Sequence, residues 1–132
     1  MRPGDGAGES LQRLCYVFDP AVPPEVEVRV TEGAERDLAE IAGFLPEREG
    51  AALAEQMLDT LFQAAAELTH FPERGSHPRE LLALGIRDFR QVLCQPYRMI
   101  HRIQGRTVFI LLVADGRRDF QSLLERRMLR GQ

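Results

Sequence analysis

The chain has 132 residues, of which 44% are hydrophobic and 28% are charged, and its formal net charge is −3. This size and composition fit a single soluble globular domain and exclude the disordered, collagenous and membrane-embedded classes. No apolar run approaches the roughly 20 residues that span a bilayer, and the first residues lack the basic-then-apolar order of a secretory signal, so a cytoplasmic location is expected.

Residues 1–25 are expected to be a flexible extension that precedes the domain. Three glycines open this stretch and three prolines close it, with only a short apolar patch at residues 14–18 between them. Clusters of glycine and proline mark linkers and tails. A wrongly assigned start codon is the alternative interpretation of the stretch. The domain itself is expected over residues 26–132.

The domain begins with a pattern typical of one strand and two helices. Valines alternate with charged residues from Val26 to Val30, which predicts a strand with one buried face. Thr31 can cap a helix that runs to Pro46, and a second helix begins near residues 49–51 and ends at Phe71 and Pro72. The short connection predicts a hairpin of two helices. The apolar stripes consist of Ala34, Leu38, Ile41, Ala42 and Leu45 in the first helix and of Leu53, Met57, Leu61, Ala65 and Leu68 in the second.

The second half of the domain is expected to be mostly strands. Residues 73–85 are interpreted as a loop because glycines and a proline interrupt them, and strands are expected at residues 86–93, 97–103 and 107–113. The last of these is apolar on both faces and therefore belongs at the centre of a sheet. An amphipathic helix follows Gly116.

The expected order is β-α-α-β-β-β-α, which is an α+β fold. The N-terminal helical hairpin packs on a small, mainly antiparallel sheet, and the helices are expected on one side of it.

Several short motifs in this order make the chain similar to one family, the ParE/RelE superfamily of bacterial type II toxin–antitoxin systems, and to its ParE branch in particular. The resemblance extends from about Val28 to Arg127. Aspartate stands at position 115 and histidine at 101, where the family commonly has histidine and tyrosine. The motifs are Ala34-x-x-Asp37-Leu38-x-x-Ile41, Leu68-x-x-Phe71-Pro72-x-x-Gly75, Gly85-Ile86-Arg87, Tyr97-Arg98-Met99-Ile100-His101-Arg102-Ile103 and Asp115-Gly116-Arg117-Arg118-Asp119.

This resemblance implies a RelE/ParE-like fold and a growth-inhibiting toxin of a plasmid stabilisation-type system. ParE-type members poison DNA gyrase, so DNA gyrase is the expected target and a ParD-like antitoxin the expected neutralising partner. The alternatives are a RelE-type endonuclease that cleaves mRNA on the ribosome and a non-toxic binding module on the same fold. No membrane partner and no sequence-specific binding of nucleic acid by the chain alone are expected.

Enzymatic signals in the sequence are sparse. RNA cleavage needs groups that move protons, yet residues 114–132 contain neither histidine nor tyrosine. His77 and His101 remain as candidates and are interpreted as solvated histidines without a catalytic task. Phosphate-loop, GxSxG, HExxH and metal-ligand spacings are missing, and Cys15 and Cys94 stand alone, so we predict no catalytic residue, no metal and no cofactor. Were the chain an enzyme, it would be an endoribonuclease.

The charges suggest a basic docking face. Residues 26–85 carry a net charge of −7 and residues 86–132 a net charge of +6, and all 17 basic residues are arginines. Arg98 and Arg102 share one face of their strand because an even number of positions separates them. A set of six residues is expected to bind the target or the antitoxin, the alternative being ordinary solvated positions with Asp119 capping the last helix or pairing with an arginine. The six are Arg87, Arg98, Arg102, Arg117, Arg118 and Asp119.

The last helix has an apolar stripe that is a candidate groove for an antitoxin helix. The alternative is that this stripe belongs to the core. Its residues are Phe120, Leu123, Leu124 and Met128.

Overall fold

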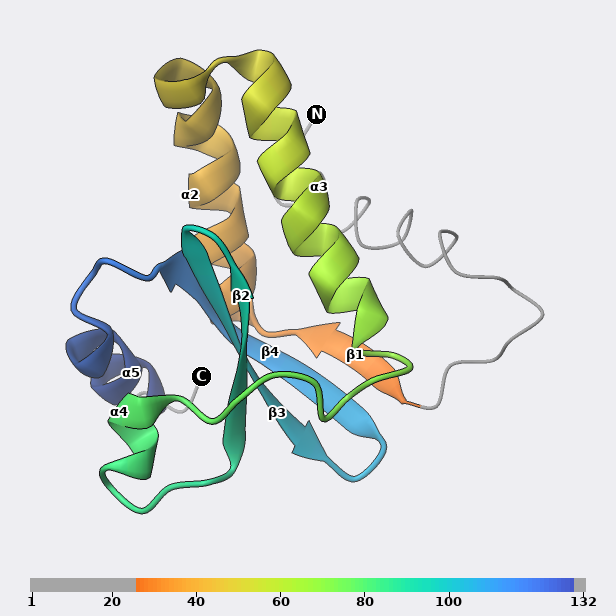
Figure 1. Cartoon of the computed structure of the whole chain (residues 1–132), viewed down its shortest axis with the longest axis vertical. Helices are drawn as coiled ribbons and strands as arrows, with labels where there is room; N and C mark the ends of the chain where they lie inside the picture. Colours follow the sequence, from red (N-terminus) through yellow and green to blue (C-terminus); the bar gives the residue numbers. More distant parts are fainter. Residues whose placement is uncertain (1–25, 130–132) are drawn as a thin grey trace.

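A four-stranded sheet separates two groups of helices in the computed structural model, which describes residues 26–129 (Figure 1). The extension expected at residues 1–25 lies outside the described residues. The α+β order is confirmed, with one short helix added between the hairpin and the second strand. The elements are β1 (Glu27–Val30), α2 (Glu32–Glu49), α3 (Ala51–Glu67), α4 (Arg79–Leu82), β2 (Phe89–Cys94), β3 (Tyr97–Gln104), β4 (Thr107–Asp115) and α5 (Phe120–Leu129).

The sheet has the strand order β1-β4-β3-β2, so the apolar strand β4 lies inside it as predicted. β1 pairs with β4 in parallel, whereas β4, β3 and β2 pair antiparallel. The register between β3 and β4 shifts by one residue, because Ile100 pairs with Leu112 and His101 pairs with Ile110. Leu111 is therefore the extra residue of a β-bulge, which leaves main-chain groups beside it without ladder partners.

The helical hairpin is joined to the sheet by its first cap. Thr31 Oγ1 accepts from Ala34 N at 3.3 Å and donates to Ile110 O at 3.0 Å, so one hydroxyl caps α2 and ties it to β4. α2 runs past the expected end at Pro46 and stops at Glu49, because a proline in the last turn removes only one hydrogen bond. Figure 1 shows that the connected ends of α2 and α3 project away from the sheet. Ala42 and Leu53, placed in the apolar stripes by periodicity, are exposed there.

Helices cover both faces of the sheet, which corrects the expectation that they lie on one side. Met99 and Val113 pack toward the hairpin, whereas their neighbours Ile100 and Leu112 pack toward α5. A central strand that is apolar on both faces requires cover on both faces. The buried helix residues on the second face are Leu81 of α4 and Phe120 and Leu124 of α5, and Leu123 of α5 packs against them.

The segment interpreted as a loop at residues 73–85 contains the one-turn helix α4 and pairs with the edge of the sheet. Ser76 and Gln91 exchange two main-chain hydrogen bonds, of 3.2 and 2.7 Å. Gly75 makes this approach possible: its φ is +96°, and a Cβ there would lie 2.0 Å from Gln91 O. Within residues 26–129 no helix is both long and apolar enough to cross a membrane.

Candidate protein-docking site

Helix α5 lies between two grooves. Leu124 and Met128 line a groove toward α4, whereas Leu123 and Arg126 line a groove toward α2. With 3.6 residues per turn, these two pairs lie on opposite sides of the helix. We call the first the apolar groove and the second the charged groove.

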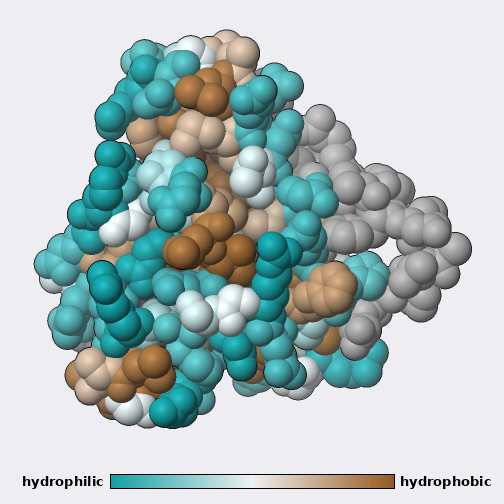
Figure 2. Space-filling view, viewed as in Figure 1, coloured by the Kyte–Doolittle hydropathy of each residue, from teal (hydrophilic) through white to brown (hydrophobic). Residues whose placement is uncertain are grey.

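The apolar groove exposes large hydrophobic side chains. Leu84 is 57% exposed and Met128 is 37% exposed. Figure 2 shows hydrophobic surface at its lower left, where α4 and the loop after it lie. Exposed apolar side chains that line one groove make it a candidate docking surface for another protein. The groove is lined by Glu80, Leu81, Leu84, Ile86, Gln121, Leu124, Glu125 and Met128.

Only two of the four residues expected in an antitoxin groove line this apolar groove. Leu124 forms part of its wall and Met128 its rim. Phe120 is core, 3% exposed, and Leu123 faces the charged groove instead. The α4 side of the groove was not expected, because the segment that contains it was interpreted as a loop.

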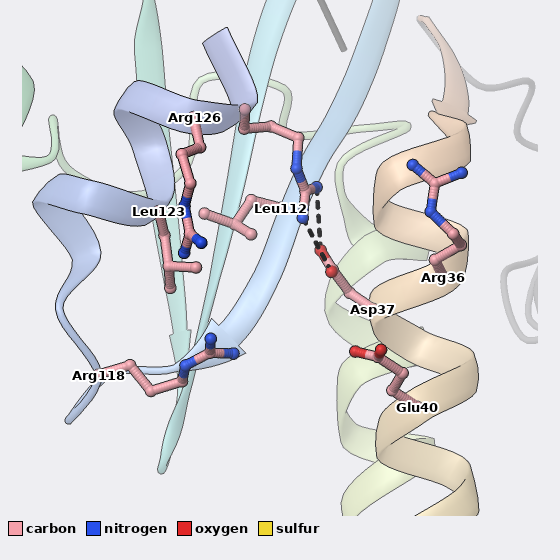
Figure 3. Close-up of a pocket in the computed structure, with 8 residues that line it drawn as sticks. Arg36, Asp37, Glu40, Leu112, Arg118, Leu123 and Arg126 are labelled. Atoms are coloured by element: carbon pink, nitrogen blue, oxygen red, sulfur yellow. Dashed lines mark hydrogen bonds and ion pairs between the residues drawn. The ribbon is translucent and has the colours of Figure 1, made fainter. Parts of the chain in front are cut away.

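The charged groove has a basic wall on the α5 side and a wall of mixed charge on α2, where Arg36 accompanies two carboxylates. Figure 3 shows Arg118 and Arg126 on the α5 side and Asp37 and Glu40 on α2 across from them. Arg118, Arg126 and Glu40 are exposed, and their side chains form no hydrogen bond or ion pair with any other of residues 26–129. The full lining is Arg36, Asp37, Glu40, Leu112, Arg118, Leu123, Arg126 and Arg127.

A largely buried ion pair closes the deep end of the charged groove. Asp37 Oδ1 and Oδ2 accept from Arg127 at 2.9 and 3.1 Å, and the two side chains are 13% and 19% exposed. The same groups satisfy the bulge in β4, because Arg127 donates to Leu111 O at 2.5 Å and Val113 N donates to Asp37 Oδ2 at 3.0 Å. Asp37 and Arg127 therefore join α2, β4 and α5 in a fixed geometry.

Arg98 is part of the interior, which corrects its expected place on a docking face. It is 9% exposed, donates to both carboxylate oxygens of Glu80 at 2.9 Å and to Gln91 Oε1 at 2.8 Å, and lies 3.9 Å over the ring of Phe120. Its bond holds the pKa of Glu80 below the ordinary 4.5. Gly116 leaves room for this side chain, since a Cβ there would lie 3.1 Å from Arg98 Cδ.

The other expected binding residues do not gather into one patch. Arg102 shares the strand face of Arg98, lies 5.8 Å over the Phe89 ring and donates to Gln104 Oε1. Arg117 is tied to Asp115, whose pKa it lowers. Asp119 caps α5 by accepting from Ser122, Arg87 is exposed in the loop before β2, and Arg118 lines the charged groove.

The two candidate histidines lie in different environments and do not converge. His101 is completely buried rather than solvated, and its Nε2 bonds to Pro72 O at 3.0 Å, while Nδ1 has no partner in the described part of the chain. His77 is half-buried, bonds to Phe89 O at 3.0 Å through Nδ1, and lines a hollow with Arg79 and Arg117. No group of three or more His, Cys, Asp or Glu residues within 26–129 is placed to hold a metal.

Burial of His101 predicts a pH-dependent stability. Desolvation lowers its pKa below the ordinary 6.5, despite the hydrogen bond to Pro72, which raises it. Below pH 6.5 the unfolded chain therefore binds the proton more readily than the folded chain, and the free energy of unfolding should fall as the pH falls from 7 toward 5. The free energy of unfolding, measured with urea at several pH values across this range, should change less with pH in His101→Gln than in His77→Gln. An equal change with pH in the two variants would contradict the role assigned to His101.

Periodicity did not single out Glu40, Glu80, Arg126 or Arg127 as site residues. Asp37 belonged to the first resemblance motif, and that was the one signal available for the ion pair. Arg126 and Arg127 were visible only as a polar face of the last helix. Their partners lie far away in sequence, and a helical pattern does not identify what faces it.

These features define a small α+β protein with two grooves beside its helix α5. A family model described as the ParE toxin of the type II toxin–antitoxin system parDE matches residues 28–120. The chain belongs to this family and is a type II toxin.

The fold is shared with a solved structure described as the chromosomal ParDE TA system from P. aeruginosa. The TM-score is 0.57, and the match covers 69% of this chain and 96% of that chain. At 16% sequence identity this likeness shows the fold alone. Among curated proteins no match to the sequence was found.

Proposed function

We propose that the chain arrests growth by binding and inhibiting DNA gyrase, and that a ParD-like antitoxin neutralises it by docking a helix in the apolar groove. Membership of the ParE toxin family supports a toxin with a protein partner. The observation that carries the docking proposal is the exposed apolar surface between α4 and α5, where Leu84 is 57% exposed.

An amphipathic helix is the partner element that fits this groove best. Covering an exposed leucine or methionine side chain contributes about 1.5–3 kcal/mol when burial is complete, so a few anchors give useful affinity. Glu125 lies exposed at the rim, where it favours a basic residue on the incoming helix. Glu80 is already neutralised by Arg98, so the α4 wall adds little net charge.

The positions of Arg98 and His101 support a function in binding more than one in catalysis. Arg98 is held by Glu80, and His101 lies in the core with a lowered pKa, so neither is available to hold a phosphate or to move a proton at the surface. Arg87 and Arg118 are exposed and available to meet a partner's acidic surface, which would speed encounter and orient the complex.

A supercoiling assay tests the proposal. Purified chain at micromolar concentration should inhibit DNA gyrase, and an equimolar amount of the antitoxin encoded beside its gene should relieve the inhibition. Leu84→Glu should leave inhibition intact but prevent relief, because a carboxylate in the apolar groove opposes docking. Leu53→Glu is the matched control, since Leu53 is 44% exposed at the far end of the helical hairpin. Folded chain that leaves supercoiling unaffected would refute gyrase as the target.

One observation favours the endonuclease as second candidate. Phe89 O can only accept, so the neutral His77 ring carries its proton on Nδ1 and presents Nε2 as a proton acceptor in a hollow that also holds Arg79 and Arg117. Cleavage of ribosome-bound message that disappears in His77→Ala would establish this activity. Harmless accumulation of the chain without antitoxin would instead indicate a non-toxic binding module.

A further inference from the structure

We infer that the charged groove between α2 and α5 reads the charge order of the antitoxin, by accepting a segment that carries an acidic side chain on one edge and a basic side chain on the other. The inference rests on the function proposed above, because the occupant is a segment of the neutralising antitoxin. It assigns a second binding site, separate from the apolar groove, on the opposite side of α5.

The α5 wall supplies two guanidinium groups for a carboxylate. Arg118 precedes α5 and Arg126 lies within it, and Figure 3 shows both extending from the same side of the groove. Both side chains are exposed, and within residues 26–129 no carboxylate pairs with either at ion-pair distance. Guanidinium groups bind carboxylates with two parallel hydrogen bonds, which makes this wall selective for an acidic side chain.

The α2 wall carries two carboxylates, Asp37 and Glu40, beside the guanidinium of Arg36. Glu40 is exposed one turn after Asp37, and its carboxylate has no hydrogen-bond or ion-pair partner in the described part of the chain. Asp37 itself is saturated by Arg127 and Val113 N. Glu40 is therefore the group of this wall that is left to bind a cation from the occupant.

The groove is prepared for binding before the partner arrives. The Asp37–Arg127 ion pair and its bonds to β4 fix the separation of the two walls, and Leu112 of β4 forms part of the lining between them. A site whose walls are already fixed loses little conformational freedom on binding.

The carboxylate of Glu40 on the α2 wall favours a peptide over nucleic acid. A phosphate backbone bound to Arg118 and Arg126 would bring several negative charges into the groove that Glu40 also lines, and repulsion between like charges would oppose this. A peptide can place one carboxylate against the arginines and one ammonium or guanidinium against Glu40. The order of these charges would then distinguish the matching antitoxin from others of similar shape.

Calorimetric titration of the chain with the antitoxin encoded by the adjacent gene tests the inference. Each charge reversal in the groove should lower the affinity for the antitoxin. Arg118→Glu with Arg126→Glu should weaken binding roughly tenfold or more, and Glu40→Arg should weaken it as well, since each reversal repels one edge of the occupant. Arg118→Gln with Arg126→Gln should give a smaller loss. The matched control is Arg29→Glu with Arg48→Glu, which changes the net charge equally at exposed positions away from the groove and should leave affinity unchanged.

The remaining outcomes identify the alternatives. Replacing single acidic residues of the antitoxin by arginine should restore binding to the Arg118→Glu/Arg126→Glu variant at one or two positions only. Tighter binding of labelled duplex DNA by Glu40→Arg, together with DNA binding by the unaltered chain, would overturn the inference in favour of a phosphate backbone. Antitoxin binding that no groove variant alters would overturn it while leaving the proposed function intact, whereas an unaltered chain that binds no antitoxin would overturn both.

Discussion

Arg98→Glu is expected to destabilise the domain by about 3–5 kcal/mol, the range for breaking a buried ion pair and leaving a charge without its partner. The reversed side chain would place a carboxylate against Glu80 and over the face of Phe120, both of which now stabilise a guanidinium. Urea unfolding followed by circular dichroism measures the effect. If Arg98→Glu stayed stable and lost only partner binding, Arg98 would be a docking residue rather than a part of the interior.

Two further variants separate the ion pair from charge in general. Arg117→Glu, at a side chain that is 78% exposed, should change the stability by less than about 1 kcal/mol. The exchanged pair Glu80→Arg with Arg98→Glu should recover part of the loss, because the attraction is restored although the stacking on Phe120 is not. Since the pKa of Glu80 is lowered, the contribution of the pair is complete above pH 4.5 and is lost as the pH falls below that value.

Asp37→Ala is expected to cost about 3 kcal/mol, because it leaves Arg127 without its partner in a largely buried position and removes the acceptor of Val113 N. Amide hydrogen exchange gives a local readout, since the Val113 amide should exchange faster in the variant even under strongly native conditions. Unchanged exchange at Val113 would show that the carboxylate does not protect the bulge.

Glu40→Ala is the matched control for this prediction. It removes a carboxylate from the same helix, one turn later and on the same groove, but the Glu40 side chain is exposed and forms no hydrogen bond or ion pair with the other described residues. Its removal should change the free energy of unfolding by no more than about 0.5 kcal/mol. A large decrease in the free energy of unfolding of Glu40→Ala would indicate that the charges of the groove stabilise the fold in general, rather than Asp37 in particular.

The order of elements could be predicted because it depends on short-range patterns. Alternation in Val26–Val30, helical spacing after the cap Thr31, and the apolar run that became β4 each contain their own signal within a few residues. The hairpin and the interior position of β4 follow from these signals with little else. The exposure of Leu53 could not be predicted in the same way, because it depends on how far the hairpin extends beyond the sheet.

The sequence by itself determined the fold class, the main helices and strands, and the even spacing that puts Arg98 and Arg102 on one strand face. Only the tertiary structure decided that α4 and α5 cover the second face of the sheet, that Arg98 meets Glu80, and that Asp37 meets Arg127, 90 positions away. The physical reason is that periodicity reports the direction of a side chain relative to its own element. Whether a charge becomes an internal ion pair or part of a docking wall depends on which distant segment packs against it.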